Sequence, residues 1–433
     1  MIENIKQILE NNENVHGYVV RNVINESKEL FFVKKNLDMN RAKKVEYFNV
    51  TVYHDFTEGE MKFKGDSTVK LAPNMSLDEM AQTIEQAALS ASFVKNPFYE
   101  LVEKTNKEVK KLSSNFSEKE MSDFLPELID AMYKHDTHNE GGINSGEIFI
   151  TKSTKRFVSS TGIDEEMISY AAQMEIVTDW DEEGKEAVEM FTVLDFSEFD
   201  KGHIEEQIKD AIENTIARAN ATPIPNISDV NVILDGENVK EFFSYYPSRA
   251  NVGSIFSRIS DAKIGDNLQG EDVAGDKVSI TLKAEITGST RNSYLDPEGV
   301  VIDELTLVDE GELKSYYGPN RISQYLGEES KGNYSNKEVK GGSKTIDELK
   351  QEPYLHCVFF SDFQMNTMTG DFGGEIRLAK YFDGEKEIPV TGGSITGNIK
   401  DVQKDMLFSV ETETMNAFKG PKIIRLKNVR IAS

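Results

Sequence analysis

The sequence contains a single cysteine, Cys357, and this scarcity excludes a framework of intramolecular disulfides. The neighbours Leu355, Val358 and Phe359 are apolar, which predicts a thiol buried in a core, while a nucleophilic or metal-binding thiolate is the less favoured alternative. One cysteine in 433 residues also suits a reducing compartment. We therefore expect a cytoplasmic protein.

Long apolar runs are also missing. No window approaches the roughly 20 apolar residues that a membrane-spanning helix requires. The first 18 residues have the pattern of a polar amphipathic helix and lack the apolar core of a signal peptide. We expect a soluble chain with no membrane partner.

Positive charge is scarce relative to negative charge. The chain has 49 Lys and Arg against 75 Asp and Glu, a formal net charge of -26. Because such a surface repels phosphate backbones, we expect no direct nucleic-acid partner. A length of 433 residues predicts two or three domains, and 38% hydrophobic residues can form a substantial core.

The first part of the chain, residues 1–140, has the pattern of an α+β domain. Residues 16–71 alternate apolar and polar side chains, which predicts a meander of hairpins with turns at Glu58-Gly59 and Gly65-Asp66. Two Ser-x-x-Glu capping boxes then predict helix starts, one at Ser76 with Glu79 and one at Ser117 with Glu120.

Residues 141–225 read as a strand–helix segment that completes the N-terminal region. Alternating runs predict strands within 141–180 and 187–196. In the helix predicted for 203–221, isoleucines recur four apart and form one apolar stripe that we expect to pack on a sheet: Ile204, Ile208, Ile212 and Ile216. The segment 222–225 (TPIP) predicts a domain boundary.

Residues 226–433 predict a third, β-rich unit. A strand over 229–235 and a helix-containing insert precede many short apolar runs separated by Gly-rich turns. This pattern is typical of a large antiparallel sandwich or barrel, so the predicted class is α+β with a β-rich C-terminal domain. Residues 327–351 are polar and Gly-rich and predict a mobile surface loop.

No generic catalytic motif is present. None of the six histidines forms the His-Glu-x-x-His arrangement of a helical zinc hydrolase. His135 and His138, with Asp136 and Glu140 nearby, could form a weak metal site, but histidines at a helix C-terminus also cap its last carbonyls, and this reading is favoured. Two Gly-rich strings, 369–375 and 391–398, lack the features of a phosphate loop and predict tight turns.

An ordered series of motifs in the C-terminal part resembles the TldD/PmbA family. These motifs are Asp296, Glu298-Gly299-Val300, Gly311, Leu313 and Gly327, followed by Thr369-Gly370-Asp371, Asp383-Gly384-Glu385, Pro389-Val390, Ile395, Gly397-Asn398 and Asp401. Their order and spacing agree from about residue 230 to the end, and the N-terminal layout is compatible with the family.

The resemblance implies a role in a metalloprotease complex, with one departure. TldD subunits carry a His-Glu-x-x-x-His helix after the strand that opens the C-terminal domain, and a cysteine ligand near the end. Here residues 236–256 contain no histidine or cysteine, Pro247 interrupts the helix pattern, and Cys357 lies too early to match. The chain thus resembles PmbA/TldE, the partner expected to hold no zinc, with no catalytic and no metal-binding residues of its own.

The resemblance implies a TldD-like catalytic partner that holds the zinc, and unfolded peptides or small proteins as substrates. The alternative is a non-enzymatic homodimer that binds peptides or a regulatory partner; a stand-alone hydrolase using His135 and His138 is the least favoured. An extended peptide can add to an exposed strand edge. Candidate cleft or interface residues, the last three by family analogy, are Tyr245, Tyr246, Arg249, Asn251, Thr369, Gly370 and Asp371. Core or interface packing is the favoured reading of the two tyrosines.

Overall fold

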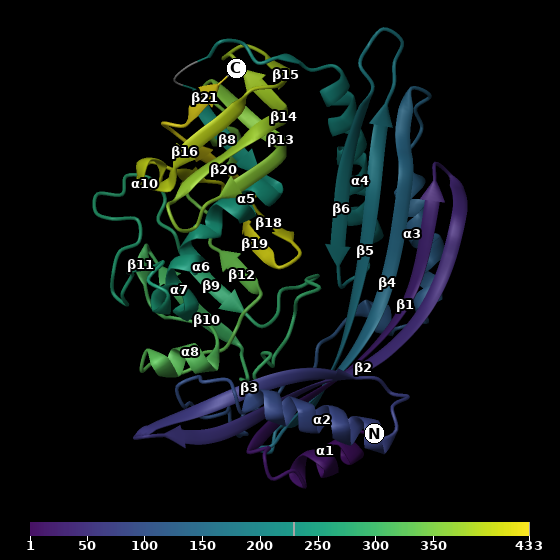
Figure 1. Cartoon of the computed structure of the whole chain (residues 1–433). Helices are drawn as coiled ribbons and strands as arrows, with labels where there is room; N and C mark the ends of the chain where they lie inside the picture. The colour runs from purple at the N-terminus through teal and green to yellow at the C-terminus, as the bar shows by residue number, and fades with distance from the viewer. Residues whose placement is uncertain (228–229, 433) are drawn as a thin grey trace.

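The computed structural model describes residues 1–227 and 230–432, so Asp229, the first residue of one predicted strand, lies outside the described residues. A long sheet with two helices on one face stands beside a β-rich C-terminal region, and the N-terminal helices lie at the lower end of that sheet (Figure 1). Helices and strands both contribute substantially, which confirms the predicted α+β class.

The long sheet has six antiparallel strands in the order β3-β2-β1-β4-β5-β6. Residues 1–140 and residues 141–225 supply three strands each, so both predicted segments build one sheet. The predicted hairpin turn at Glu58-Gly59 is confirmed. The strands are β1 (Gly17–Val33), β2 (Asn36–Glu58), β3 (Met61–Leu71), β4 (Gly141–Ser159), β5 (Asp164–Trp180) and β6 (Val188–Phe196).

Four helices cover this sheet. Near its lower end lie α1 (Ile2–Glu10) and α2 (Leu77–Ala91), and on one face of its upper part lie α3 (Met121–Tyr133) and α4 (Lys201–Ala219). The predicted isoleucine stripe is confirmed, because Ile204, Ile208 and Ile212 are buried against the sheet. Side chains alternate between the two faces of a strand, so Ile148 and Ile150 of β4 face these helices and the odd-numbered residues face the C-terminal region.

Strand β6 is much shorter than β5. Its residues pair only with Ala172–Trp180 of β5, while β4 pairs with β5 along nearly its whole length. In the described part of the chain, no strand pairs with the outer edge of residues 164–171. The first half of β5 therefore presents an open strand edge.

The C-terminal region contains two further sheets. One has the order β11-β10-β9-β12-β19-β18, and the other runs β17-β20-β8-β13-β14-β15-β7 with β16 and β21 attached. Most pairs are antiparallel, as predicted, but β13–β8, β12–β19 and β15–β7 are parallel. The strands are β7 (Thr222–Pro223), β8 (Asn231–Asp235), β9 (Ile280–Lys283), β10 (Glu304–Asp309), β11 (Glu312–Leu313), β12 (Asn336–Val339), β13 (Tyr354–Met365), β14 (Asp371–Phe382), β15 (Glu387–Thr391), β16 (Ser394–Asn398), β17 (Leu407–Phe408), β18 (Thr412–Met415), β19 (Phe418–Pro421), β20 (Ile423–Leu426) and β21 (Arg430–Ala432).

Six short helices complete this region and connect or cover its strands. They are α5 (Gly236–Phe243), α6 (Tyr245–Ala250), α7 (Val252–Phe256), α8 (Asn320–Tyr325), α9 (Ile346–Leu349) and α10 (Ile399–Val402). A single large apolar core runs through the region and includes the buried side chains of α5 and α6. Cys357 lies in this core and is fully buried, which confirms the prediction of a core thiol.

Two local predictions in the N-terminal region are wrong. The expected turn at Gly65-Asp66 lies inside β3, where Gly65 faces α2; a Cβ at Gly65 would lie only 1.8 Å from the carbonyl oxygen of Ala91. The expected capping box at Ser117 is not formed either. Ser117 donates its hydroxyl to the carbonyl of Ser114, and α3 begins after Glu120 without a side-chain cap.

The predicted mobile loop over 327–351 is also wrong. It contains β12, which pairs with both β9 and β19 in the middle of a sheet. Asn336 is buried there, donates to the carbonyl of Ala284 at 3.1 Å and accepts from the Ser289 hydroxyl at 2.7 Å. A capping box between Thr345 and Glu348 then starts α9. Polar residues of this segment thus form hydrogen bonds that hold β12 and α9 in place.

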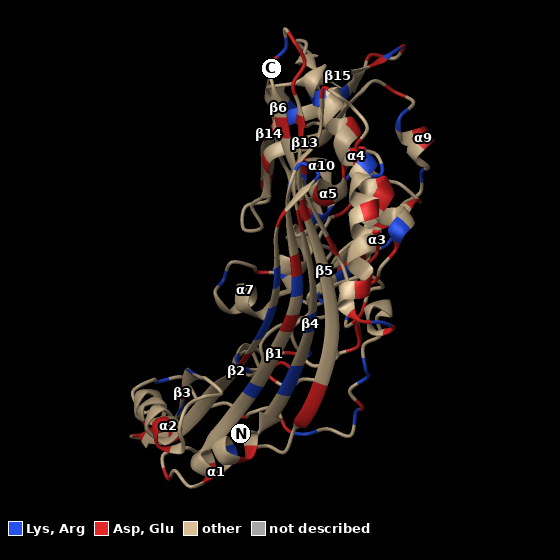
Figure 2. Cartoon of the chain, turned by 90° about the vertical axis from the view of Figure 1, so that its right-hand side faces the viewer, with Lys and Arg blue, Asp and Glu red and all other residues tan. Residues whose placement is uncertain are grey.

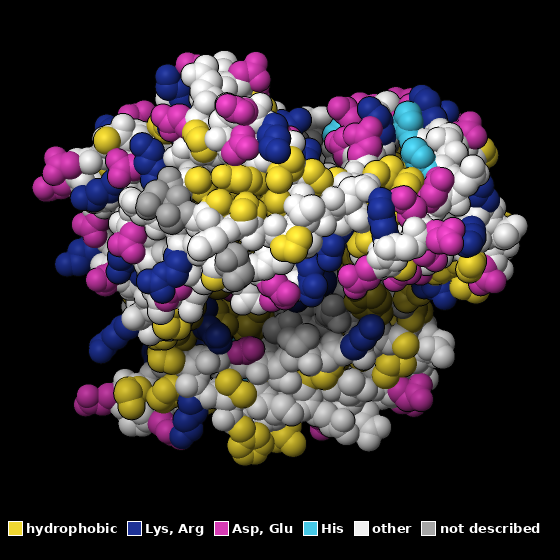
Figure 3. All heavy atoms as spheres, turned by 90° about the horizontal axis from the view of Figure 1, so that it is seen from above, with side chains coloured by type: hydrophobic (Ala, Val, Ile, Leu, Met, Phe, Trp, Pro, Cys, Tyr) yellow, Lys and Arg dark blue, Asp and Glu magenta, His cyan; other side chains and the backbone are white. Residues whose placement is uncertain are grey.

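Charged residues are interspersed on the surface. Acidic and basic side chains alternate along the long strands (Figure 2) and also mix on the face seen from above (Figure 3). Within residues 1–227 and 230–432, no helix has both the length and the apolar composition needed to cross a membrane.

Replacing Ile208 by alanine tests the packing of α4 on the long sheet. Ile208 is fully buried, so Ile208→Ala should lower the free energy of unfolding by about 2–5 kcal/mol. Ile216, at the end of the same stripe, is only partly buried, and Ile216→Ala should cost clearly less. Urea denaturation of both variants checks this, and equal losses would contradict the packing.

Candidate functional site

The segment after β8 forms three short helices instead of one long helix. α5 ends at Phe243, α6 begins at Tyr245 with Pro247 in its first turn, and Asn251 has an extended backbone between α6 and α7. Asn251 Oδ1 accepts a hydrogen bond at 2.9 Å from the backbone N–H of Gly253 and so caps α7. The predicted break in this helix is confirmed.

The two predicted tyrosines of this segment are buried in the core. The hydroxyl of Tyr246 donates to Gln403 Oε1 at 3.1 Å, and burial raises the pKa of Tyr246 well above its ordinary value. Tyr245 is 6% exposed and lies against Tyr246 in an edge-to-face arrangement. Both rings therefore position the segment, and their part in a cleft or interface stays a prediction.

Arg249 lies at the surface end of α6. Its guanidinium donates to the carbonyl of Ile259 at 3.1 Å and pairs with the exposed carboxylate of Asp261. A backbone N–H, then Arg249, and then the charge of Lys400 hold the pKa of Asp261 below its usual range. Asp261 and Lys400 belong to no recognisable sequence motif, so the sequence did not predict them as part of this site.

Thr369, Gly370 and Asp371 form the turn between β13 and β14. The Thr369 hydroxyl donates to Asp371 Oδ2 at 2.7 Å, and the amide of Asn398 donates to Asp371 Oδ1 at 2.8 Å. These hydrogen bonds, from Asn398 first, lower the pKa of Asp371. Gly370 has a φ of 85°, and a Cβ there would lie 2.8 Å from Ile399 Cγ2 and 3.5 Å from the Tyr245 ring. The fold thus brings the turn against α6 and α10.

A second polar cluster lies where β8 passes into α5. His356 Nε2 is 2.8 Å from Asp235 Oδ2, while its other ring nitrogen is buried without a hydrogen-bond partner among the described residues. Burial, reinforced by the charge of Asp235, raises the pKa of the neighbouring Glu413 to about 7 against the opposing charge of Lys422.

Metal-ligating side chains do not converge in the described residues, 1–227 and 230–432. No group of three or more His, Cys, Asp and Glu there has the spacing to hold a metal ion. His138 instead lies edge-on to Trp180 with ring centroids 5.3 Å apart, and the nearly buried Asp136 pairs with Lys35 at 3.3 Å.

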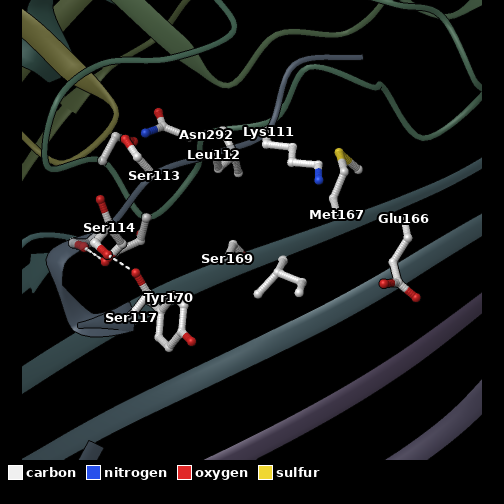
Figure 4. Close-up of a pocket in the computed structure, with 14 residues that line it drawn as sticks. Lys111, Leu112, Ser113, Ser114, Ser117, Glu166, Met167, Ser169, Tyr170 and Asn292 are labelled. Atoms are coloured by element: carbon white, nitrogen blue, oxygen red, sulfur yellow. Dashed lines mark hydrogen bonds between the residues drawn. The ribbon is translucent and has the colours of Figure 1, made fainter. Parts of the chain in front are cut away.

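Two adjoining clefts lie between the long sheet and the C-terminal region, and no motif pointed to them. The first, of about 300 Å³, lies along the open edge of β5 and is lined by Glu166–Tyr170; Figure 4 shows Lys111 and Asn292 across from the strand. The second, of about 430 Å³, continues between β4 and the loop that contains Arg291. Both are lined by Leu112, Met167, Ser169, Thr290 and Asn292. Together they make a groove beside an unpaired strand edge.

Comparison with known proteins finds similarity to a family in the C-terminal part of the chain. Residues 228–433 match the family model of the PmbA/TldA metallopeptidase C-terminal domain. An uncharacterized protein of Methanocaldococcus jannaschii is 24% identical over 206 residues, a match that spans 45% of this chain and about half, 49%, of that protein. Both findings support the resemblance that the C-terminal motifs predicted.

The whole chain shares its fold with solved structures. TldE from Thermococcus kodakarensis superimposes with a TM-score of 0.80 at 17% identity, covering 100% of both chains. Proteins described as candidate modulators of DNA gyrase give TM-scores of 0.79 for Thermotoga maritima and 0.80 for Bacteroides thetaiotaomicron, each at 15% identity. The first covers 99% of this chain and 100% of the other, and the second covers 100% and 98%.

Substituting Gly370 tests the packing of the β13–β14 turn. Gly370→Ala combines a positive φ with a contact against Ile399, so it should destabilise the protein by about 1–3 kcal/mol. Gly392 is the matched control, because its φ is 81° and a Cβ there meets nothing within 4 Å. Thermal unfolding should show a smaller loss for Gly392→Ala; a smaller loss for Gly370→Ala would contradict the packing.

Glu413 predicts a pH-dependent stability. Its pKa rises from 4.5 to about 7 on folding, so the folded state binds the proton more tightly. This contribution to stability is complete below pH 4.5 and is lost as the pH rises through 7. Glutamine does not titrate, so Glu413→Gln does not lose this contribution. The free energy of unfolding of the variant minus that of the native protein should therefore increase between these pH values, by up to about 3 kcal/mol. A constant difference across that range would refute the shift.

Proposed function

We propose that this chain is a TldE-like, peptide-holding subunit of a TldD/TldE-type metalloprotease complex. Two findings support this: residues 228–433 match the family model of the PmbA/TldA C-terminal domain, and the whole chain has the fold of TldE. In this proposal a TldD-like partner holds the zinc and cleaves unfolded peptides or small proteins in the cytoplasm. This chain holds the peptide and does not cleave it.

The residues after β8 support the division of roles. In TldD this position carries the His-Glu-x-x-x-His helix, whose imidazoles bind the metal. Here 236–256 offers no imidazole or thiolate, and Phe242, Phe243 and Tyr246 are fully or almost fully buried in the core. The imidazole and thiolate ligands typical of a structural or catalytic zinc site are therefore missing from this sequence segment.

The open edge of β5 is the observation that carries the peptide-holding part of the proposal. Its residues 164–171 have no paired strand on the outer side in the described structure, and 166–170 line a cleft. An extended peptide can add to such an edge through main-chain hydrogen bonds, which demand little of its sequence. In this proposal, a flexible chain lies between the edge and the facing loop.

Metal analysis and peptide cleavage test the assignment of roles. The purified chain should contain negligible zinc and leave an unfolded peptide intact, and cleavage should appear when a TldD homologue is co-expressed. Stoichiometric zinc together with cleavage by the chain alone would overturn the proposal.

Backbone-methylated peptides test the strand edge. On a strand edge, only alternate residues of an added strand donate hydrogen bonds to it. In one peptide, three alternate backbone nitrogens that would donate to the edge are methylated, and binding should weaken at least about tenfold. In a second peptide the methyl groups are shifted by one residue, and binding should change little. Calorimetric titration of both peptides measures this, and equal affinities would exclude addition to the edge.

A non-enzymatic homodimer is the second candidate function. Four large apolar residues near the β1–β2 hairpin are 42–57% exposed and offer a surface for another protein: Val33, Leu37, Met39 and Val45. Light scattering of the chain alone and mixed with a TldD homologue separates the candidates. A heterodimer formed at the expense of any homodimer supports the complex, and a homodimer that retains peptides and ignores the homologue supports the alternative.

A further inference from the structure

The larger cleft is rich in cations although the chain as a whole carries a net charge of -26. The basic residues that line it come from β1, β4, β9 and the loop before β10: Arg21, Lys155, Arg156, Lys283 and Arg291. Asp296 is the one acidic residue among the described residues lining this cleft. The charge of the cleft lining is therefore mainly positive, opposite in sign to the net charge of the chain.

Three of these charges already have partners. Arg156 forms two hydrogen bonds of 2.8 Å with Asp164, and Lys283 pairs with Glu338 at 2.6 Å and with Glu304 at 3.3 Å. The carboxylate of Asp296 is occupied by the backbone N–H groups of residues 298, 300 and 333, at 2.8–3.0 Å. Asp296 therefore shapes its own loop, and among the described residues it forms no ion pair with the basic residues of the cleft.

Lys155 and Arg291 both line this cleft. Within residues 1–227 and 230–432, no ion pair joins either side chain to a carboxylate. Surrounding protein atoms first, and then the charge of Arg291, lower the pKa of Lys155, although solvent still reaches its side chain in the cleft. Two cations held together in this way favour an anion between them. Arg21 lies further along the same wall, where it donates to the carbonyl of Pro297.

This pair lies next to the open edge of β5. Lys155 is paired in register with Met167, and Met167 lines both clefts. A peptide strand added outside β5 would run about 10 Å from β4, two strand spacings away. At that distance, a carboxylate on the cleft side of the peptide comes within reach of the long side chains of Lys155 and Arg291 across Met167.

We propose that Lys155 and Arg291 form a carboxylate-binding subsite for the peptide that lies along β5. The inference rests on the proposed peptide-holding function and adds a preference to it. The main chain of the peptide binds the strand edge without regard to sequence, and the two cations select and align a segment that carries a carboxylate. That carboxylate belongs either to an Asp or Glu side chain or to the C-terminus of the peptide.

Three synthetic peptides of one unfolded sequence test the subsite by calorimetric titration against the full chain. The first has both ends capped and one central Glu. The second is identical except that Gln replaces this Glu. The third has the Gln sequence with a free C-terminal carboxylate. The native chain should bind the first or the third about ten- to a hundredfold more tightly than the second. Preference for the first identifies a side-chain carboxylate, and preference for the third identifies the chain end.

The double variant Lys155→Met with Arg291→Gln should abolish this preference while its affinity for the capped Gln peptide stays the same. Lys152→Met is the control for the lysine substitution, because Lys152 lies on the same strand but faces the opposite side of the sheet, and its replacement also removes one positive charge. It should keep the preference. Both basic residues of the subsite are exposed, so the double variant should unfold at an unchanged or slightly higher temperature.

The outcomes separate the subsite from the function on which it rests. Equal affinity of the native chain for all three peptides, or a preference that survives in the double variant, would overturn the subsite and leave peptide holding intact. Failure of all three peptides to bind would overturn the proposed function itself.

Discussion

The difference in length between β5 and β6 is the constraint on which the rest of the account depends. β5 has 17 residues and β6 has 9, so one half of β5 keeps an unpaired edge in the described structure. Proteins usually protect such edges, because unpaired backbone groups recruit other strands. Here the loop around Lys111 and the loop around Asn292 flank the edge and leave a groove beside it. Under the proposed function, this groove is where an extended chain binds.

The cleft and the helical segment after β8 illustrate opposite uses of the same fold. In α5 and α6, aromatic side chains fill the interior, and Phe243 packs edge-to-face on Phe408. The phenyl rings of Phe242 and Phe243 carry no metal-ligating atom. Along β4 and β5, by contrast, polar and basic side chains remain accessible next to backbone groups that lack partners.

The sequence predicted the strands and helices that have strong local patterns. The isoleucine stripe of α4 and the capping box at Ser76 succeeded because packing and local hydrogen bonding there agree with the pattern. The turn predicted at Gly65 was wrong because this glycine is required by the close approach of α2, and the sequence does not distinguish such a glycine from one in a turn. Residues 327–351 misled because the buried Asn336 obtains its partners from Ala284 and Ser289, about fifty residues away in the sequence.

The candidate site was predictable only in part, for a related reason. The family motifs consist largely of residues that shape turns: Asp383 accepts from two backbone N–H groups at 2.9 and 3.0 Å, and Gly299 and Gly311 have positive φ. Such motifs identify the fold and say little about the groove. Gly370 of the Thr369–Asp371 turn lies close to Tyr245, and the part of these residues in a cleft or interface stays a prediction. Lys155 and Arg291, however, are 136 positions apart, and only the tertiary structure reveals that they line one cleft.

Hydrogen–deuterium exchange of the full chain, measured with and without a saturating unfolded peptide, tests the central claim most directly. The account predicts that the peptide slows exchange in residues 165–171 of β5, because their outward N–H groups gain partners, while residues 172–180, already paired with β6, change little. Unchanged exchange at 165–171, together with protection at a different surface, would contradict it.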